Sequence, residues 1–543
     1  MKRLMIAAVI GCLVTTSCTQ VAGWFGSAPD SAKGEAVDSS SYAAWARDET
    51  ITESNAYSDL FLDSTSLENY IEKEKLNDSS ARAIRNFYLV RNYQYAWFTS
   101  NGMTEQGRGL WNLRPQDSAT FNNKFKEHMD SVVQNDSLTI MRGDTSFVET
   151  ELDLTKELVQ YAQNGRNSLV NTSNIYYLVP AKKQDPLQLA DSILNKQKDS
   201  AEYANNKSYN LLKEQLAIYY KAAKDSTWQA VPASTKNLRK GSKSVAVTAL
   251  KKRLQATNDY TSSDTSAVFT DSLQVAIKDL QQRNGLSPTG IINDSLINVL
   301  NIPAEQRVEQ ILVNMNRMLW VKPMEDSNRI VVNIPTLMLY AFEGSNKVFE
   351  MPVIVGKEGT STMMFSGDIN QLVFNPTWHI PQSIVQSEIM PKMKADPNYL
   401  KKKNMEVVKQ NDSIPTINQL PGKENALGKV KFLFPNSYDI YLHDTPDKTL
   451  FAKKDRALSH GCIRVGDAEK LTQYLLRDQN DWSQDKIRTA LNSNKEQMVK
   501  VKNPEPVYIT YYTAWTDENG KMNFRDDVYG HDKNTSDRMF TRS

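Results

Sequence analysis

Cysteine is nearly absent from this chain of 543 residues, which contains only Cys12, Cys18 and Cys462. Two of the three lie close to the N-terminus, so a protein that loses this segment has no intramolecular disulfide. Neither sign of charge is in excess, because 65 lysines and arginines stand against 63 aspartates and glutamates. The balance argues against the basic face that nucleic acid requires, and no nucleic acid is expected as a partner. Beyond the N-terminus, no apolar run approaches the length of a membrane span.

The N-terminus is typical of an export signal. Lys2 and Arg3 precede an apolar run at residues 4–14, which is too short to cross a bilayer, and small residues follow it. Cys18 resembles the lipid-modified cysteine of a bacterial lipoprotein, although Thr15 stands where such sites prefer leucine. An ordinary cleaved signal is the alternative. Both readings predict an exported protein, and we expect a periplasmic lipoprotein that is anchored in the membrane through Cys18.

The rest of the chain divides by composition and periodicity. Small and polar residues without periodicity predict a flexible linker, and a helical pattern with an aromatic cluster then predicts a scaffold domain. Three short helices separated by Gly and Pro turns come next, and a helix with one apolar face connects them to a strand-rich region. The predicted segments are a signal at 1–18, a linker at 19–57, a helical scaffold at 58–235, a three-helix module at 236–302, a connecting helix at 303–324, a strand-rich domain at 325–532 with a polar, lysine-rich insertion at 384–428, and a C-terminal tail at 533–543.

The chemistry concentrates in the strand-rich region. Cys462 lies in the motif Ser-His-Gly-Cys-Ile-Arg at residues 459–464, and His443 stands nineteen residues upstream, at the end of a predicted strand. Cysteine attacks acyl carbon as the thiolate, and a neighbouring imidazole can accept its proton. A lone cysteine is more often an inert core residue. Here Gly461 permits close backbone approach, and the dense polar motif is a poor packing segment, which favours Cys462 as a nucleophile.

These motifs resemble a known family. The strings Tyr-Leu-His-Asp-Thr-Pro at 441–446 and Ser-His-Gly-Cys-Ile-Arg-Val at 459–465 resemble the catalytic domain of L,D-transpeptidases (YkuD type). The order of modules is similar to the long periplasmic subfamily, with a scaffold domain and a capping subdomain. The unit at 236–302 resembles the peptidoglycan-binding domain of wall hydrolases, through LRKGS at 238–242 and QQRNGL at 281–286. The resemblance implies a multidomain α+β fold: a mainly helical scaffold, a three-helix peptidoglycan-binding-like module, and a β-rich catalytic domain with a helical capping insertion.

The resemblance also implies a reaction. Cys462 would form a thioester with the third residue of a tetrapeptide stem and release the terminal D-Ala. An amine of a neighbouring stem would then resolve the thioester and give a 3→3 cross-link in peptidoglycan. His443 would act as general base and later as acid, and N–H groups around Gly461 and Cys462, with the region of Tyr441, would hold the oxyanion. No cofactor and no metal are expected, and carbapenem antibiotics would acylate Cys462.

Further residues of the motifs are candidates for supporting roles. His460 is expected to orient the site, with a second acid/base as the alternative, and Ser459 is a candidate for fixing the tautomer of His443. Arg464 would hold a substrate carboxylate or pair with an acidic residue. A zinc site formed by His443, His460 and Cys462 is disfavoured, because the short ligand spacing of zinc motifs is lacking. The candidates for substrate contact are Arg464, Trp378 and Asn375.

Three functions fit the sequence. The first is the transpeptidase, and the second is an L,D-carboxypeptidase in which water replaces the amine at the same site. The third is a catalytically silent lipoprotein whose module at 236–302 binds peptidoglycan, although such a module can also serve only as a brace. The expected partners are peptidoglycan stem peptides and glycan strands.

Overall fold

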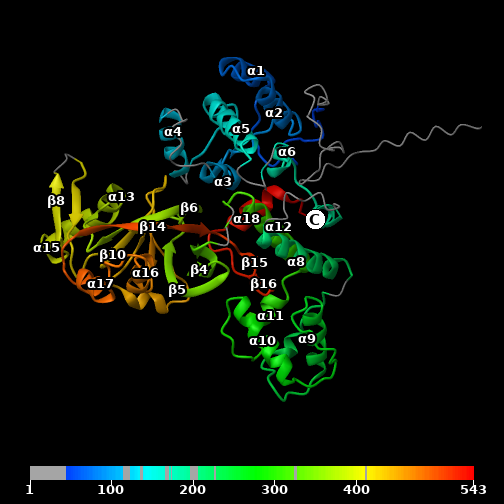
Figure 1. The fold of residues 1–543 in the computed structure, drawn as a ribbon. Coiled ribbons are helices and arrows are strands. Elements are labelled where there is room, and N and C mark those ends of the chain that lie inside the picture. The colour runs from blue at the N-terminus through cyan, green and yellow to red at the C-terminus, as the bar shows by residue number, and fades with distance from the viewer. Residues whose placement is uncertain are drawn as a thin grey trace, which may run out of the picture.

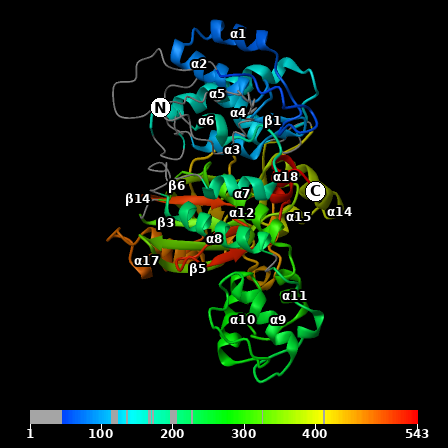
Figure 2. The ribbon, with the colours of Figure 1, turned by 90° about the vertical axis from the view of Figure 1, so that its right-hand side faces the viewer.

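The structure is a computed structural model, which describes residues 45–113, 123–134, 138–165, 170, 172, 174–195, 206–225, 228–322, 324, 327–409 and 413–542. The expected signal at 1–18, including Cys18, lies outside the described residues, as does most of the expected linker. Figures 1 and 2 show a helical N-terminal region, a sheet domain and a three-helix module that meet around helices α8 (Lys207–Lys224) and α12 (Ala304–Met318). The predicted multidomain α+β fold is confirmed.

The N-terminal helical region packs round a buried aromatic core. Its first two helices begin at the caps Asp63 and Asn77, whose side chains each accept a hydrogen bond from the backbone N–H three residues on. Trp97 and Phe98, from the predicted aromatic cluster, are fully buried in this core. Its elements are α1 (Ser64–Lys73), α2 (Asp78–Leu89), β1 (Phe98–Thr99), β2 (Gly102–Met103), α3 (Glu105–Leu113), α4 (Asn123–Gln134), η1 (Thr145–Phe147), α5 (Val148–Gln163), α6 (Ile175–Leu178), α7 (Pro186–Asn195), α8 and η2 (Ala233–Thr235).

A buried carboxylate holds the centre of this core. Glu151 of α5 accepts hydrogen bonds from the backbone N–H groups of Ala96 at 2.6 Å and Trp97 at 3.1 Å, and from the hydroxyl of Tyr88 at 3.0 Å. Burial raises the pKa of this carboxyl to about 7. The network supplies acceptors to two N–H groups that burial removes from water.

Two segments, one before the scaffold and one at the C-terminal side of the sheet domain, differ from the sequence prediction. The linker was expected to run to residue 57, but Ile51, Ala56 and Tyr57 are buried, so the packed chain begins earlier. Residues 533–543 were expected to form a tail, but helix α18 (His531–Met539) packs against α12, and Phe540 is buried in the scaffold core. A few apolar residues in a polar stretch are enough to dock such segments once a core exists to receive them.

The connecting helix α12 joins the scaffold to the C-terminal segment. It packs along α8, as its apolar face predicts. Its buried Arg317 forms ion pairs with Glu105 of α3 and, at 2.7 Å, with Asp532 of α18. One guanidinium therefore ties together three helices that lie far apart in sequence.

The three predicted helices of the module are present and form their own core. They are α9 (Val245–Gln255), α10 (Asp271–Arg283) and α11 (Asp294–Leu300). The module is braced against the C-terminal hairpin of β15 (Ala514–Thr516) and β16 (Met522–Phe524). Arg283 donates to the carbonyl of Met522 at 2.5 Å, Arg525 donates to the carbonyl of Arg283 at 2.6 Å, and Lys521 pairs with Asp279 at 2.9 Å.

The strand-rich region forms one sheet of nine strands with the order β12-β5-β13-β11-β10-β6-β14-β3-β4. Strand β4 also pairs with β5, so the eight strands from β5 to β4 in this order close into a ring, and β12 lies outside it. Helices α16 (Ala468–Leu475) and α17 (Gln484–Leu491) contribute to its core. The strands and short helices are β3 (Arg329–Asn333), η3 (Ile334–Thr336), β4 (Met338–Glu343), β5 (Asn346–Gly356), β6 (Phe365–Phe374), β10 (Val430–Leu433), β11 (Leu442–His443), η5 (Lys448–Ala452), β12 (Ala457–Ser459), β13 (Ile463–Val465) and β14 (Gln497–Thr510).

The predicted capping insertion has a small core of its own, with Val385 and Ile417 at its centre. It was expected to be helical, but it also contains a three-stranded antiparallel sheet with the order β7-β9-β8. Strand β7 precedes the predicted boundary at residue 384, so the cap starts earlier. Its elements are β7 (Trp378–His379), α13 (Gln382–Ile384), η4 (Val385–Ile389), α14 (Met390–Ala395), α15 (Tyr399–Lys402), β8 (Met405–Lys409) and β9 (Thr416–Gln419).

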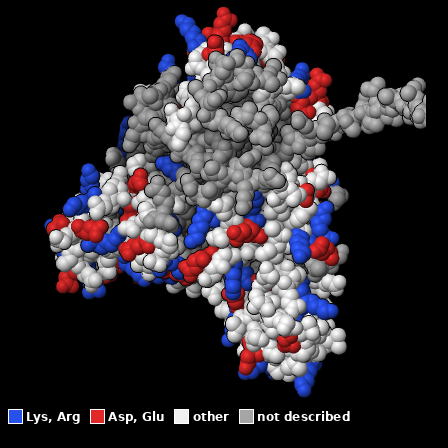
Figure 3. All heavy atoms as spheres, turned by 45° about the vertical axis from the view of Figure 1, so that its right-hand side comes forward, with Lys and Arg blue, Asp and Glu red and all other residues white. Residues whose placement is uncertain are grey.

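The distribution of charge on the surface agrees with the balanced composition. Over the face shown in Figure 3, lysines and arginines are interspersed with aspartates and glutamates. Among the described residues, no helix has the length and apolar character needed to cross a membrane.

Candidate active site

Two short parallel strands bring the predicted catalytic residues together. In β11 and β13, Leu442 lies opposite Ile463 and His443 lies opposite Arg464. Leu442 and Ile463 are buried in the core of the sheet. Successive side chains of a strand point to opposite faces, so the neighbours of these two residues lie on the other face. The residues on that face are Tyr441, His443, Cys462 and Arg464.

The turn before Cys462 is held by its own backbone and by a neighbouring loop. Gly461 has φ of +113°, a conformation that side chains with a Cβ rarely adopt. Its carbonyl accepts a hydrogen bond from the Thr362 hydroxyl at 2.7 Å, and its N–H donates to Ser459 Oγ at 3.2 Å. The Ser459 hydroxyl in turn donates to the carbonyl of Cys462 at 2.6 Å. The Ser459 side chain therefore orients the Cys462 turn, rather than His443 as its position in the motif suggested.

The tautomer of His443 is set by the next residue in the chain. His443 is buried, and its Nδ1 lies 2.5 Å from the backbone carbonyl oxygen of Asp444. A carbonyl can only accept, so Nδ1 carries the proton and Nε2 presents a lone pair. Burial, together with the nearby charge of Arg464, lowers the pKa of His443 to about 3. The imidazole is therefore neutral and has the tautomer of a general base.

Cys462 keeps part of its surface open beside this imidazole. Its Sγ lies 3.8 Å from the backbone carbonyl of Asp439, to which the thiol can donate. Burial raises the pKa of the Cys462 thiol, and hydrogen bonds from the N–H and the hydroxyl of Tyr441 oppose this rise. The hydroxyl of Tyr441 also accepts a hydrogen bond from Trp378 of the cap. The resting site thus holds a thiol with polar contacts to the backbone.

The backbone donors of the turn are not equivalent. The N–H of Gly461 is engaged by Ser459, so Gly461 shapes the turn and does not present a donor for an oxyanion, contrary to the expectation. For the N–H of Cys462, the described part of the chain provides no hydrogen-bond partner. This N–H and the Tyr441 hydroxyl are therefore the candidate donors for an oxyanion.

The flanking charged residues of the motif point to different neighbours. Nε2 of His460 lies 2.8 Å from a carboxylate oxygen of Glu388 in η4, so His460 contacts the cap. Arg464 lies within electrostatic range of Asp447 and Cys462. Its Nε is buried and has no hydrogen-bond partner among the described residues. An unpaired guanidinium nitrogen beside the thiol suits a substrate carboxylate.

The two other candidates for substrate contact, Trp378 and Asn375, lie in different surroundings. Trp378 reaches Tyr441 and so borders the site. Asn375 is buried, and its amide nitrogen donates to the carbonyl of Ala490 at 2.7 Å and lies 3.1 Å from Ser493 Oγ. Asn375 therefore fastens the end of α17 to the sheet, which corrects the prediction that it contacts substrate.

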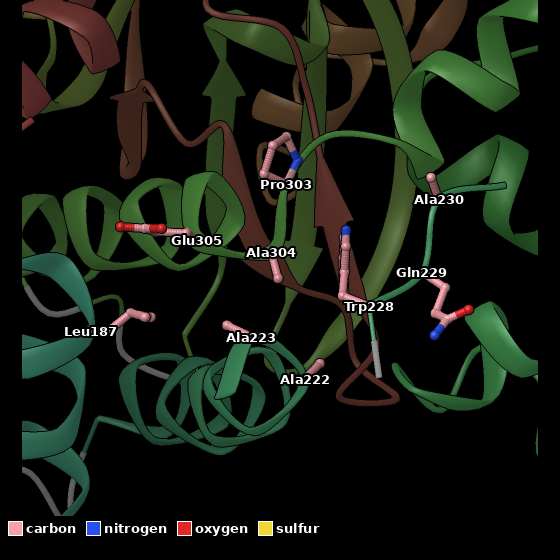
Figure 4. A pocket seen from close by; sticks show the side chains of 9 residues that line it. All are labelled: Leu187, Ala222, Ala223, Trp228, Gln229, Ala230, Pro303, Ala304 and Glu305. Carbon is pink, nitrogen blue, oxygen red and sulfur yellow. The ribbon is translucent and has the colours of Figure 1, made fainter. Parts of the chain in front are cut away.

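Within the described ranges, no group of three or more His, Cys, Asp or Glu side chains is arranged to hold a metal ion. A cavity of about 500 Å³ lies elsewhere, between α8, the segment around Trp228 and the start of α12. Figure 4 shows its lining residues, among which Gln229 and Glu305 carry polar side chains.

Comparison with known proteins agrees with this geometry. Residues 327–509 match the family model described as L,D-transpeptidase catalytic domain (YkuD). Residues 82–216 match a scaffold domain, and residues 243–300 match a model described as "Putative peptidoglycan binding domain". Residues 327–509 are thus similar to an L,D-transpeptidase catalytic domain, and the chain combines this region with the two further domains.

Individual proteins are similar to parts of this chain. A protein of Haemophilus influenzae named "Putative L,D-transpeptidase" is 33% identical over 294 residues, which cover 51% of this chain and 59% of the relative. The match thus spans less than two thirds of that relative's length. The L,D-transpeptidase of Stackebrandtia nassauensis is 13% identical with a TM-score of 0.22, over 50% of this chain and 95% of that one. L,D-transpeptidase 3 of Mycobacterium tuberculosis, solved with a faropenem-derived adduct, is 13% identical with a TM-score of 0.18, over 34% and 60%.

Proposed function

We propose that this protein is a peptidoglycan L,D-transpeptidase that forms 3→3 cross-links between stem peptides. The observation that carries the proposal is the shared face of β11 and β13, which presents Cys462, His443 and Arg464 together. On this face the imidazole has a fixed tautomer with Nε2 unprotonated, which is the form that accepts a thiol proton.

The first half of the reaction is acyl transfer to the enzyme. The Cys462 sulfur attacks the carbonyl between the third residue of a tetrapeptide stem and its terminal D-Ala, and the thiol proton passes to His443 Nε2. The N–H of Cys462 and the Tyr441 hydroxyl stabilise the oxyanion, a contribution of roughly 3–4 kcal/mol per donor in studied proteases. The C–N bond then breaks, D-Ala leaves with the proton from His443, and a thioester remains on Cys462.

The second half transfers the acyl group to an amine. A side-chain amine of a neighbouring stem attacks the thioester carbonyl, and its proton passes to His443 Nε2. The C–S bond breaks, and the sulfur takes back the proton as the thiol is restored. Arg464 binds the carboxylate of the donor stem, because its guanidinium lies within electrostatic range of Cys462.

Mass spectrometry of products tests the proposal. The purified protein is incubated with a disaccharide-tetrapeptide, with Cys462→Ala as the control. We expect a dimer whose mass corresponds to the loss of one D-Ala per cross-link, and no dimer with the variant. Tripeptide without dimer would mean that water is the acceptor and the protein is an L,D-carboxypeptidase. No product at all, with binding to peptidoglycan intact, would support the silent binding protein instead.

The same nucleophile predicts an inhibitor class. A β-lactam carbonyl is an acyl carbon of the kind that Cys462 attacks, so carbapenems should form a thioester with its sulfur. The adduct should appear as a mass increase on the tryptic peptide 457–464, which contains Cys462 and ends at the next arginine. Cys462→Ala should abolish it.

We further propose the location and the partners of the protein. The N-terminal sequence supports export to the periplasm and lipidation at Cys18. We assign glycan strands to the module at 236–302. Its contacts with the β15–β16 hairpin support a fixed distance between the bound glycan and Cys462.

A further inference from the structure

One scaffold residue spans two loops of the catalytic domain. Asn112, near the end of α3, donates from its amide nitrogen to the backbone carbonyl of Met364 at 2.7 Å. Its amide oxygen accepts a hydrogen bond from the hydroxyl of Tyr438 at 3.0 Å. A single side-chain amide thus uses both its donor and its acceptor across the boundary between the two domains.

The first of these loops supports the turn that carries the nucleophile. The 357–364 loop joins β5 to β6 and ends at Met364. Thr362, two residues earlier, donates its hydroxyl to the carbonyl of Gly461 at 2.7 Å. The position of this loop therefore controls the position of the residue before Cys462.

The second loop forms the opposite side of the sulfur. The 434–441 loop joins β10 to β11 and is organised by Asn436, whose side-chain oxygen accepts from the N–H of Tyr438 at 2.9 Å. The amide nitrogen of Asn436 donates to two further carbonyls of the loop. Asp439 has a φ of +53°, and its carbonyl lies 3.8 Å from the sulfur of Cys462. This loop therefore shapes the surroundings of the thiol.

The same loop also ends at the residue that stabilises the thiolate. Tyr441 directs its N–H and its hydroxyl to Cys462. A second scaffold contact reinforces the loop, since Gln134 of α4 donates to the carbonyl of Ser437 at 2.5 Å. The ring of Tyr438 packs against Phe365 at 5.3 Å between centroids, so its hydroxyl can be removed without displacing the ring.

We propose that Asn112 is a positioning residue for Cys462, and that the scaffold domain sets the reactivity of the thiol through the two loops that Asn112 joins. The inference rests on the proposed role of Cys462 as nucleophile. An aspartate at this position would repel the carbonyl of Met364, and an apolar residue would lose both hydrogen bonds. Only a side-chain amide supplies donor and acceptor together at this length.

Alkylation of Cys462 tests the proposal without requiring turnover. The full chain and its variants are treated with iodoacetamide across a range of pH, and labelling of peptide 457–464 is followed by mass spectrometry. The variants are Asn112→Leu, Tyr438→Phe and the matched control Gln215→Ala. Gln215 of α8 also donates from its side-chain amide to a distant backbone carbonyl, that of Gly520 at 2.8 Å, but it contacts the β15–β16 hairpin and neither of the two loops. Cross-linking of tetrapeptide gives kcat and KM for each variant.

We expect Asn112→Leu and Tyr438→Phe to alkylate about tenfold more slowly near neutral pH, the equivalent of one hydrogen bond, with the thiol titrating at higher pH. The kcat should fall by a similar factor with KM unchanged, and Gln215→Ala should match the wild type. Equal effects on alkylation in all three variants would overturn the proposal. If Asn112→Leu does not fold, a wild-type alkylation profile in Tyr438→Phe would overturn it instead. The two variants could alkylate more slowly although the wild-type protein makes no cross-links. That result would uphold the positioning role of Asn112 and refute only the proposed transpeptidase function.

Discussion

Raising the pH should accelerate the alkylation of Cys462 steadily, without an inflection where a histidine usually titrates. The pKa of the thiol lies above its ordinary value of 9.0, and that of His443 is about 3. At pH 7 the thiolate therefore makes up less than about 1% of the protein. The two residues rest as a neutral thiol and a neutral imidazole.

Burial raises the pKa of the Cys462 thiol above its ordinary value and lowers that of His443 to about 3. Moving the thiol proton to the imidazole is therefore unfavourable in the resting site. The neutral pair is therefore the resting state, and the proton moves to His443 only during attack on substrate.

The assay is labelling of peptide 457–464 with iodoacetamide in the full chain, with Cys462→Ser as the blank. The rate should rise about tenfold per pH unit from about pH 5 to about pH 9. His443→Ala should keep this slope, because iodoacetamide needs only the thiolate, but it should lose about 10²–10⁴-fold in acyl transfer from tetrapeptide. A rate that is constant between about pH 5 and pH 8 would reveal a thiolate–imidazolium pair and refute the reasoning.

Three further predictions concern stability. The pKa of His443 is about 3 in the folded chain, against an ordinary value of 6.5. Below pH 6.5 the unfolded chain therefore binds a proton that the folded chain does not, and the free energy of unfolding falls. The loss should be about 1.4 kcal/mol per pH unit in urea unfolding, and His443→Gln should remove that slope. Arg317→Ala should destabilise the protein by about 3–5 kcal/mol in thermal unfolding, since two carboxylates stay buried without their partner; a loss below about 1 kcal/mol would contradict this. Glu151→Leu should cost about 2–4 kcal/mol, because two buried N–H groups lose their acceptors. Glu151→Gln keeps an acceptor oxygen for only one of these N–H groups, so it should cost less than Glu151→Leu, about 1–2 kcal/mol, by the same measurement.

The sequence predicted the parts of the protein that depend on local patterns. The three helices at 236–302 begin at the N-caps Ser244, Thr270 and Asn293, whose side chains accept hydrogen bonds from N–H groups two or three residues on. The scaffold region and the connecting helix were predicted for the same reason, since an apolar face at helical spacing is visible in the sequence.

The sequence was less informative where a segment depends on distant partners. Ile51 looks like an isolated apolar residue in a polar stretch, and Phe540 lies in an otherwise polar C-terminal segment. The burial of Ile51 and the place of Phe540 in the scaffold core appear only in the folded chain. The cap sheet escaped prediction because β7 and β9 are short and lie far apart in the chain. Asn375 lies in a motif that resembles the family, but a motif does not show which way a side chain points.

The sequence by itself determined the reactive groups of this protein: a cysteine after a glycine, and a histidine at the end of a strand. Only the tertiary structure determined the face of the sheet that these groups share. The reason is that the register of β11 against β13 depends on pairing between segments that are separated in the sequence. The tertiary structure alone also brought Asn112 to Tyr438, across 326 positions of the chain. Such contacts form only when whole domains pack, so no local pattern can encode their partner.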